Sequence, residues 1–210
     1  MQEYHKIQSI FKRDEKTHKF IEGEWSLPEF EYLEHNEWEF TEKVDGTNVR
    51  VAWQPDLLDP FQVQFGGRTD NAQMPTSLLA RLQELFPVDK FAAVYPEIPM
   101  TLYGEGYGAR IQKGGGNYKA DGVDFMLFDV LIGDLWLERC NVNDIAQALG
   151  IGFAPVVGQG SIYGAIAIVT MHLQSTFGPF EAEGLVIRPK VELQTRRGYR
   201  VISKLKARDF

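Results

Sequence analysis

The sequence predicts an α+β fold with largely antiparallel sheets. Short stretches that alternate apolar and polar residues, or that are continuously apolar, outnumber the helical stretches. Strands and helices do not alternate regularly along the chain, which disfavours a doubly wound parallel fold. The length of 210 residues suits one sizeable domain, and we expect a single domain over residues 1–210.

Seven stretches are predicted strands. The first two, 38–44 and 48–53, flank an Asp-Gly-Thr turn, which predicts that they form a β-hairpin. The other predicted strands are 62–68, 100–108, 124–132, 184–190 and 199–206.

Two stretches are predicted helices and a third is ambiguous. Residues 75–86 begin with a proline and polar residues and then place apolar residues at helical spacing. Residues 141–150 have Asn141 or Asn143 as an N-cap and Gly150 as a stop signal. Residues 164–175 are mostly apolar, and periodicity alone leaves helix and strand open there.

Composition and charge exclude several classes of protein. The formal net charge of −7 argues against a general nucleic-acid coating protein, and no stretch approaches the roughly 20 apolar residues of a membrane span. The single cysteine, Cys140, fits a reducing cytoplasm, where we expect the protein. Residues 188–210 nevertheless carry eight Lys or Arg against two acidic residues. This strip could bind phosphates, but a solvated strand face explains it as well.

The stretch EKVDGTNVR, residues 42–50, contains a lysine, Lys43, that could be either a catalytic nucleophile or an ordinary residue beside a turn. A lysine amine is a nucleophile only when it is neutral, which nearby cations favour and nearby acids oppose. Glu42 and Asp45 flank Lys43, so they make sense beside a nucleophile only if they face a substrate, a metal or another base. Asp-Gly-Thr-Asn is also an ordinary turn, and for this stretch alone the structural interpretation is the more common one.

Two carboxylates lie beside glycines at the ends of predicted strands. Glu105 stands between two glycines, which would let a ligand or backbone approach closely. Glu183 precedes a glycine and could hold a divalent cation, usually through water for Mg²⁺. The cationic loop KGGGNY, 113–118, could reach phosphates. An exposed loop Glu and a strand-starting Glu are the plain alternatives.

Lys204 and Lys206 are two residues apart on a predicted strand, so their side chains share a face. Two ammonium groups there would attract an oxyanion, although an exposed lysine face is the more common case. The sequence has no P-loop, HExxH, GxSxG or zinc-like pattern, and its four histidines are scattered.

Six motifs follow one another along the chain: K-x-D-G-T-N-x-R (43–50), GRTD (67–70), YGEGYG (103–108), FMLFDV (125–130), EGLVIRP (183–189) and K-L-K (204–206). In this order they resemble the collinear motif set of the covalent nucleotidyltransferases, which comprise ATP-dependent RNA ligases, DNA ligases and mRNA capping enzymes. The Thr and Asn after Asp-Gly, with the loop GYGARIQKGGGNY, make the chain most similar to the RNA ligase family, on the RNA ligase 2 and RNA-editing-ligase side. The resemblance covers residues from about 38 to 206. It implies a nucleotidyltransferase (ATP-grasp-like ligase) domain with two mainly antiparallel sheets flanked by helices.

The resemblance implies catalytic roles for four residues. Lys43 would attack the α-phosphate of ATP and form lysyl-AMP with loss of pyrophosphate. Lys204 and Lys206 would contact the α-phosphate, stabilise its developing charge and supply the positive field around Lys43. Glu183 would belong to the ATP site as the carboxylate tied to catalysis by Mg²⁺ or Mn²⁺.

The rest of the implied ATP site surrounds the adenosine. Glu105 matches the carboxylate that binds the ribose hydroxyls, and Phe128 matches the aromatic ring that stacks on adenine. Arg68 matches the arginine near the ribose and the RNA phosphate, and Glu42 is expected at the adenine edge. The nucleophile loop is expected to be shaped by Asp45, Gly46, Asn48 and Arg50.

The implied enzyme passes AMP to an RNA 5′-phosphate and seals that end to a 3′-hydroxyl. Its partners would be RNA ends, and an accessory protein is a further candidate partner. No membrane association is expected, and the protein is expected to be a monomer. The chain ends four residues after Lys206, so no C-terminal OB-fold or accessory domain is expected. The alternatives are a DNA ligase or GTP-using capping enzyme, a stand-alone adenylyltransferase that needs a partner to hold RNA, and a non-catalytic binding module.

Overall fold

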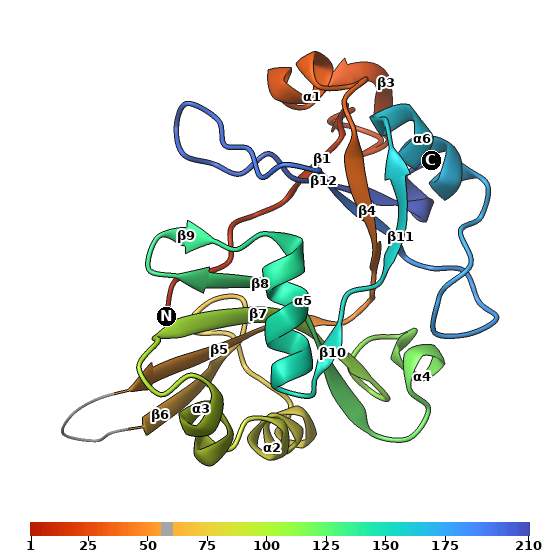
Figure 1. Ribbon diagram of the computed structural model, residues 1–210. Coiled ribbons are helices and arrows are strands. Elements are labelled where there is room, and N and C mark those ends of the chain that lie inside the picture. Colours follow the sequence, from red (N-terminus) through yellow and green to blue (C-terminus); the bar gives the residue numbers. More distant parts are fainter. Residues whose placement is uncertain (56–60) are drawn as a thin grey trace. The chain divides into compact units, whose positions relative to one another are not determined.

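The computed structural model describes residues 1–55 and 61–210 and confirms the α+β fold with mainly antiparallel sheets (Figure 1). The contacts divide the chain into two units, each with its own sheet and hydrophobic core. Unit 1 comprises Met1–His5 and Asp45–Ala154, and unit 2 comprises Lys6–Val44 and Pro155–Phe210. The expected single domain over 1–210 stays a prediction.

The sheet of unit 1 has the strand order β10-β8-β7-β5-β6, and β9 pairs with β8. All of its pairs are antiparallel except β10 with β8. The strands are β5 (Thr47–Pro55), β6 (Phe61–Gly66), β7 (Met100–Gly108), β8 (Val123–Ile132), β9 (Leu135–Trp136) and β10 (Gly152–Phe153). The helices are α2 (Thr76–Leu85), α3 (Val88–Val94), α4 (Gly115–Tyr118) and α5 (Arg139–Ala148).

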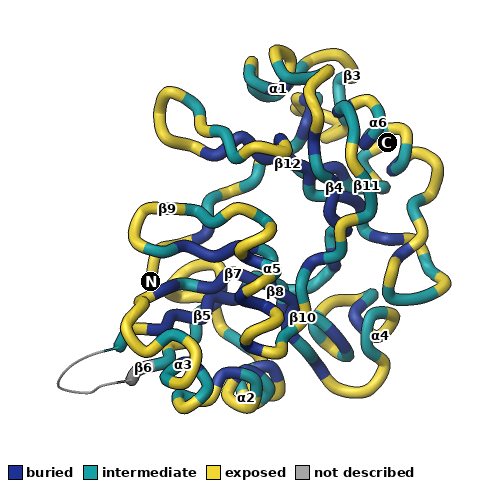
Figure 2. The backbone as a smooth tube through the Cα atoms, viewed as in Figure 1, coloured by how far each residue is buried: buried dark blue, intermediate teal, exposed yellow. Residues whose placement is uncertain are grey.

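Three helices cover one face of this sheet. Leu78 of α2, Phe91 of α3 and Ile145 of α5 belong to one core with Val49 and Val51 of β5. Each such side chain contributes about 1.5–3 kcal/mol when fully buried. Because side chains alternate along a strand, the residues between these apolar positions lie on the opposite face. Figure 2 shows how strongly β7 and β8 are buried at the centre of the sheet.

The sheet of unit 2 has the order β1-β13-β12-β4-β11, in which only the β1–β13 pair is parallel. Its strands are β1 (Gln8–Ser9), β4 (Trp38–Lys43), β11 (Val156–Gly160), β12 (Gly184–Pro189) and β13 (Ser203–Lys206). A separate pair is formed by β2 (Phe11–Arg13) and β3 (Phe20–Trp25). The helices are α1 (Pro28–Tyr32), α6 (Ile162–Thr170) and the 3-10 helix η1 (Ala207–Asp209).

Helix α6 packs on one face of this second sheet. Ile162 and Ala165 join a core with Phe40 of β4, Ile187 of β12 and Leu205 of β13. The Ser161 side chain accepts a hydrogen bond from the amide of Gly164 and so caps the helix. The ambiguous stretch 164–175 is therefore helical in its first part, and the helix begins before that stretch.

The predicted hairpin of 38–44 with 48–53 is wrong. Strand β4 pairs with β11 and β12, whereas β5 pairs with β6 and β7 in the other unit. The Asp-Gly-Thr segment does not reverse the chain onto itself but carries it from unit 2 into unit 1. A turn-forming sequence fixes a local bend, not the identity of the partner strand.

Element boundaries also differ from prediction, most clearly at α5 and β13. Helix α5 begins after Glu138, so Asn141 and Asn143 lie inside it, while Gly150 follows the helix with a φ of 58° as expected of a stop signal. The predicted strand 199–206 is a regular strand only from Ser203 onward. Before it, Arg200 forms an isolated bridge with Gln194. No described helix, in residues 1–55 or 61–210, is long and apolar enough to cross a membrane.

Candidate active site

Lys43 is part of a row of residues that crosses three neighbouring strands of unit 2. Gly184 on β12 pairs with Lys43 on β4 and with Lys206 on β13. Glu183, the residue before this glycine, places its carboxylate between the two lysines. Its Oε2 lies 2.5 Å from the Lys43 Nζ, and its Oε1 lies 2.5 Å from the Lys206 Nζ. The structure thus joins the first, fifth and sixth motifs in one cluster.

The glycine at 184 is what allows this approach. Its φ is +150°, and a Cβ at this position would lie 1.9 Å from the Leu205 carbonyl oxygen and 2.8 Å from the Lys206 Cα. Any side chain would therefore push β12 away from β13. The Glu-Gly pair of the EGLVIRP motif has two separate tasks: the glycine lets the strands meet, and the glutamate bridges the lysines.

The charge state of Glu183 follows from its surroundings. Burial alone raises the pKa of this carboxyl, but the ion pairs with Lys43 and Lys206 outweigh burial and hold its pKa below the usual value. Glu183 is therefore a carboxylate at neutral pH. One negative and two positive side chains leave the cluster with a net positive charge, which favours an anionic ligand.

Lys204 lies on the same face of the sheet as Lys206, as the spacing predicts. It pairs with Val186 on one side and with Ser9 of β1 on the other, one row along from the Lys206 row. Paired residues of neighbouring strands place their side chains on the same face, so Lys43, Lys204 and Lys206 share it.

Glu42 lies on the other face of β4, because it is adjacent to Lys43 in the same strand. Its side chain is buried, and its carboxylate accepts hydrogen bonds from the Ser175 hydroxyl at 2.5 Å and from the Thr176 amide and hydroxyl at 2.8 and 2.6 Å. This geometry gives Glu42 the task of holding the 175–176 segment. Its expected contact with the adenine edge gains no support from the structure and stays a prediction.

In unit 1, Asn48 and Glu105 form another row on the face opposite the helices. Asn48 of β5 pairs with Glu105 of β7, which pairs with Met126 of β8. Among the described residues, the buried Asn48 Oδ1 has no hydrogen-bond partner. A buried amide oxygen without a donor is unusual in a folded protein and marks a place where a ligand could supply one.

The glycines around Glu105 let neighbouring groups approach closely, and at Gly104 these include backbone, as expected: a Cβ there would lie 2.5 Å from the Met126 carbonyl oxygen. A Cβ at Gly104 would lie 2.2 Å from the Phe125 ring, and one at Gly106 would lie 2.5 Å from the Leu78 side chain. Alternation places these glycines on the helix-covered face and Glu105 on the other face. They let the core pack closely beneath the strand that carries Glu105.

Phe128 is the extra residue of a β-bulge. Tyr103 pairs with Asp129 and Gly104 with Leu127, so Phe128 has no partner in the β7–β8 ladder. Bulges re-aim side chains near functional sites. The Phe128 carbonyl accepts a hydrogen bond from Arg139 at 3.2 Å. The Phe128 ring lies edge-on to the Tyr4 ring, with the ring centroids 5.1 Å apart.

Arg50 is fully buried and donates hydrogen bonds to three groups of unit 1. Its Nε donates to the Gly67 carbonyl at 2.6 Å, its Nη1 to the Met1 carbonyl at 3.0 Å and its Nη2 to Asp70 at 2.8 Å. Arg50 therefore orders the 67–70 loop, in which Arg68 is exposed. This geometry ties Arg50 to the 67–70 loop and leaves Arg68 exposed, and the expected ATP-site roles of both residues stay predictions.

Sequence reasoning missed the buried group around Tyr4. The Tyr4 hydroxyl donates to Asp129 at 2.5 Å, and its ring packs against Tyr103 and Trp136. Burial raises the pKa of Tyr103 to about 12. Nothing in MQEYHK signals this role, because it depends on contacts with residues far along the chain, such as Asp129, which is 125 positions away.

No cluster of three His, Cys, Asp or Glu side chains that could hold a metal ion occurs in residues 1–55 and 61–210. Glu183, the predicted metal ligand, is thus a lone carboxylate whose two oxygens both contact lysines. Such a donor fits Mg²⁺ or Mn²⁺ only where substrate phosphates and water supply the remaining ligands.

The fold and the lysine cluster define a nucleotidyltransferase-type protein, and comparison with known proteins narrows this class. The chain belongs to the RNA ligase family, whose sequence model matches residues 36–206. Among curated proteins, no sequence matches the chain.

Solved structures of a Naegleria gruberi RNA ligase have the same fold. The chain is 20% identical to the form with PPi, with a TM-score of 0.65, and 17% identical to a mutant with ATP and Mn, with a TM-score of 0.66. A further mutant, with AMP and Mn, is 19% identical with a TM-score of 0.66. Each comparison covers 85% of this chain and 52% of the other, so the chain spans about half the length of that ligase.

Proposed function

We propose that this protein is an ATP-dependent RNA ligase that works through a lysyl-AMP intermediate on Lys43. The observation that carries the proposal is the Lys43–Glu183–Lys206 cluster, with Lys204 one row away on the same face. A lysine beside two further cations, all accessible from one face of a sheet, suits attack on a phosphate. Family membership and the ATP, AMP and PPi complexes of the Naegleria ligase support the same activity.

In the first step, the neutral Lys43 amine attacks the α-phosphorus of ATP. A P–N bond forms while the bond to the bridging oxygen breaks, and pyrophosphate leaves. The Lys43 Nζ loses one proton before the attack and one after it. Glu183, at 2.5 Å, is positioned to accept the first proton, and water accepts the second. Lys204 and Lys206 stabilise the charge that develops on the phosphoryl oxygens.

The adenosine would be bound by the row of residues in unit 1. The Glu105 carboxylate accepts hydrogen bonds from the ribose hydroxyls, and the Asn48 Oδ1, which lacks a donor in the described residues, accepts one more. The Phe128 ring, set apart by its bulge, stacks on the adenine.

The later steps transfer AMP and then join two RNA ends. An oxygen of the RNA 5′-phosphate attacks the adenylyl phosphorus, the P–N bond breaks and Lys43 recovers a proton. The 3′-hydroxyl of the second end then attacks the 5′-phosphate, and AMP leaves. Arg68, exposed in the loop that Arg50 orders, contacts the RNA phosphate.

Glu183, together with ATP phosphates and water, would hold Mg²⁺ or Mn²⁺, which would neutralise phosphate charge. The chain's own residues still position the nucleophile and the phosphate.

The test is covalent labelling by ATP that carries its label in the α-phosphate. We expect a labelled band on a denaturing gel from the wild type with Mg²⁺ or Mn²⁺, and none from Lys43→Ala. Lys190→Ala, which removes an exposed lysine paired with Glu37, is the matched control and should label normally. Absence of label on the wild type, or equal label on Lys43→Ala, contradicts the proposal.

A panel of ends separates the remaining alternatives. Sealing of nicked RNA supports the proposal, whereas preference for nicked DNA indicates a DNA ligase. Labelling without sealing of any end indicates a stand-alone adenylyltransferase that needs a partner. ATP binding without label indicates a binding module.

A further inference from the structure

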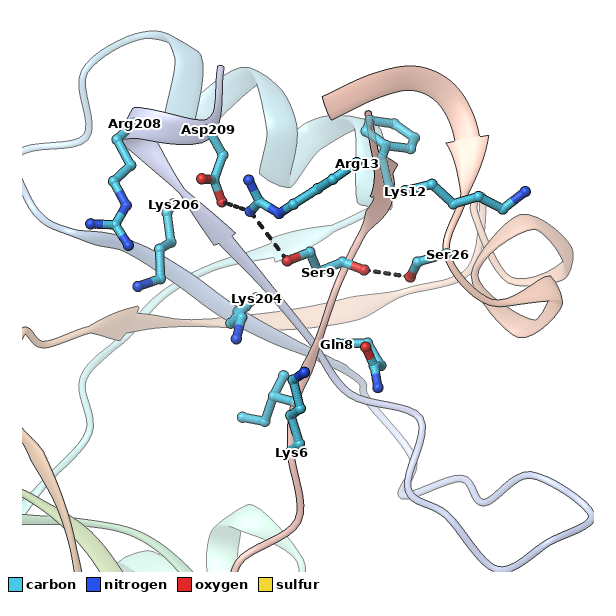
Figure 3. Close-up of a pocket in the computed structure, with 12 residues that line it drawn as sticks. Lys6, Gln8, Ser9, Lys12, Arg13, Ser26, Lys204, Lys206, Arg208 and Asp209 are labelled. Atoms are coloured by element: carbon cyan, nitrogen blue, oxygen red, sulfur yellow. Dashed lines mark hydrogen bonds and ion pairs between the residues drawn. The ribbon is translucent and has the colours of Figure 1, made fainter. Parts of the chain in front are cut away.

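A basic pocket in unit 2 adjoins the paired lysines on the side away from Lys43. It has a volume of about 500 Å³ and lies along β1, β2, β13 and η1 (Figure 3). Six of its lining residues are cationic and one is acidic, although the whole chain has a net charge of −7. These residues are Lys6, Lys12, Arg13, Lys204, Lys206, Arg208 and Asp209. Lys43 and Glu183 are not among the lining residues.

The cations of the pocket differ in how far they are already neutralised. Arg13 contacts Asp209 at 2.5 Å, and Lys12 extends away from the other lysines toward Glu24. Lys6 and Arg208 are exposed and form no ion pair with any residue in 1–55 or 61–210. Figure 3 shows the Lys206 and Arg208 side chains extending side by side, with Lys204 and Lys6 lower in the view.

The position of the pocket follows from the order of the strands. The sheet runs from β4, which carries Lys43, through β12 to β13, which carries Lys206, and ends at β1. Neighbouring strands are about 4.8 Å apart. A line from the Lys43 Nζ past the Glu183 carboxylate to the Lys206 Nζ therefore points across the sheet toward the β13–β1 edge. The pocket lies along that edge.

Phosphoryl transfer needs the attacking and leaving atoms roughly in line on opposite sides of the phosphorus. If Lys43 attacks an α-phosphate held by Lys204 and Lys206, the leaving group lies beyond those lysines. We propose that the pocket binds the β- and γ-phosphates of ATP, and then the leaving pyrophosphate, through Lys6 and Arg208. This inference rests on the proposed function. Both residues lie outside the family match, which covers residues 36–206.

Direct binding of inorganic pyrophosphate to the unadenylylated full chain, measured by calorimetry, tests the pocket without requiring catalysis. We expect Lys6→Ala and Arg208→Ala each to weaken pyrophosphate binding about tenfold, as loss of one charge-assisted contact predicts. AMP, which has no β- or γ-phosphate, should bind all variants equally. Lys16→Ala and Arg197→Ala remove exposed cations outside the pocket and are the matched controls. Unfolding curves check that each variant is folded.

A second measurement follows the discharge of pre-formed lysyl-AMP by added pyrophosphate. The pocket variants should need about tenfold more pyrophosphate for half-maximal discharge, with the same rate at saturation. Equal pyrophosphate affinity in the wild type and both pocket variants overturns the proposal. So does weakened binding of a 5′-phosphorylated RNA with unchanged pyrophosphate binding, which would make the pocket an RNA site. A wild type that binds pyrophosphate through Lys6 and Arg208 but never labels with ATP would instead refute the proposed function alone.

Discussion

Replacing Glu183 by glutamine should destabilise the protein through the loss of one charge. The carboxylate bridges Lys43 and Lys206 at 2.5 Å on each side, and its side chain is only 14% exposed. Removing one partner of a buried ion pair costs about 3–5 kcal/mol. Glutamine retains the shape and one hydrogen bond, worth about 1–2 kcal/mol. We therefore expect a loss of about 1–4 kcal/mol at pH 7.

The effect should depend on pH in one direction. Because the pKa of Glu183 in the folded protein is below its value of 4.5 in the unfolded chain, its ion pairs stabilise the fold fully above about pH 4.5. This stability is lost as the pH falls through the folded-state pKa, where the carboxyl becomes protonated. The difference between wild type and Glu183→Gln should therefore shrink in acid.

Urea unfolding of both proteins at several pH values measures this difference. Glu181→Gln is the matched control, because Glu181 is near in sequence but 45% exposed and pairs only with His172 among the ion pairs of the described residues. We expect the control to change the unfolding free energy by less than about 0.5 kcal/mol. A Glu183→Gln effect equally large at pH 7 and in acid, or no larger than that of the control, would refute the electrostatic account.

Three other substitutions test the remaining geometry. Gly184→Ala should cost about 3–5 kcal/mol in unfolding free energy, because the new Cβ would lie 1.9 Å from a backbone oxygen; near-normal stability would contradict this. Tyr4→Phe should cost about 1–3 kcal/mol through the lost hydrogen bond to the buried Asp129, and a neutral result would show that this bond carries no net stability. Arg50→Lys keeps the charge but loses the fork that joins three partners, so it should cost about 2–3 kcal/mol and increase amide hydrogen exchange in the 67–70 loop; unchanged exchange there would exclude the positioning role.

The part of the site that follows from local spacing was predictable. Lys204 and Lys206 share a face because strand side chains alternate, and this holds although the strand is shorter than predicted. The same rule applies to Glu42, which is adjacent to Lys43 and therefore points the other way. Alternation was thus the signal that separates Lys43 from the neighbouring Glu42.

The part that depends on strand pairing was not predictable. Glu183 lies 140 residues from Lys43 in sequence, and only the order of the strands places its carboxylate between two lysines. Phe128 escapes the alternation rule because a bulge shifts the ladder at this residue. The short strands β1 and β2 lack enough alternating residues to be recognised, yet β1 closes the edge of the sheet.

Because β1 pairs with β13 in parallel, the segment that folds as a unit begins earlier in the chain than the segment that matches the family. The family match begins at residue 36, but the strand with Lys204 and Lys206 pairs with Gln8 and Ser9. A chain trimmed to residues 36–206 would leave the backbone amides and carbonyls of β13 without these neighbours. An exposed strand edge promotes association between molecules. Such a fragment would keep every recognisable motif, yet it would be prone to aggregate at the strand that holds the phosphate-binding lysines.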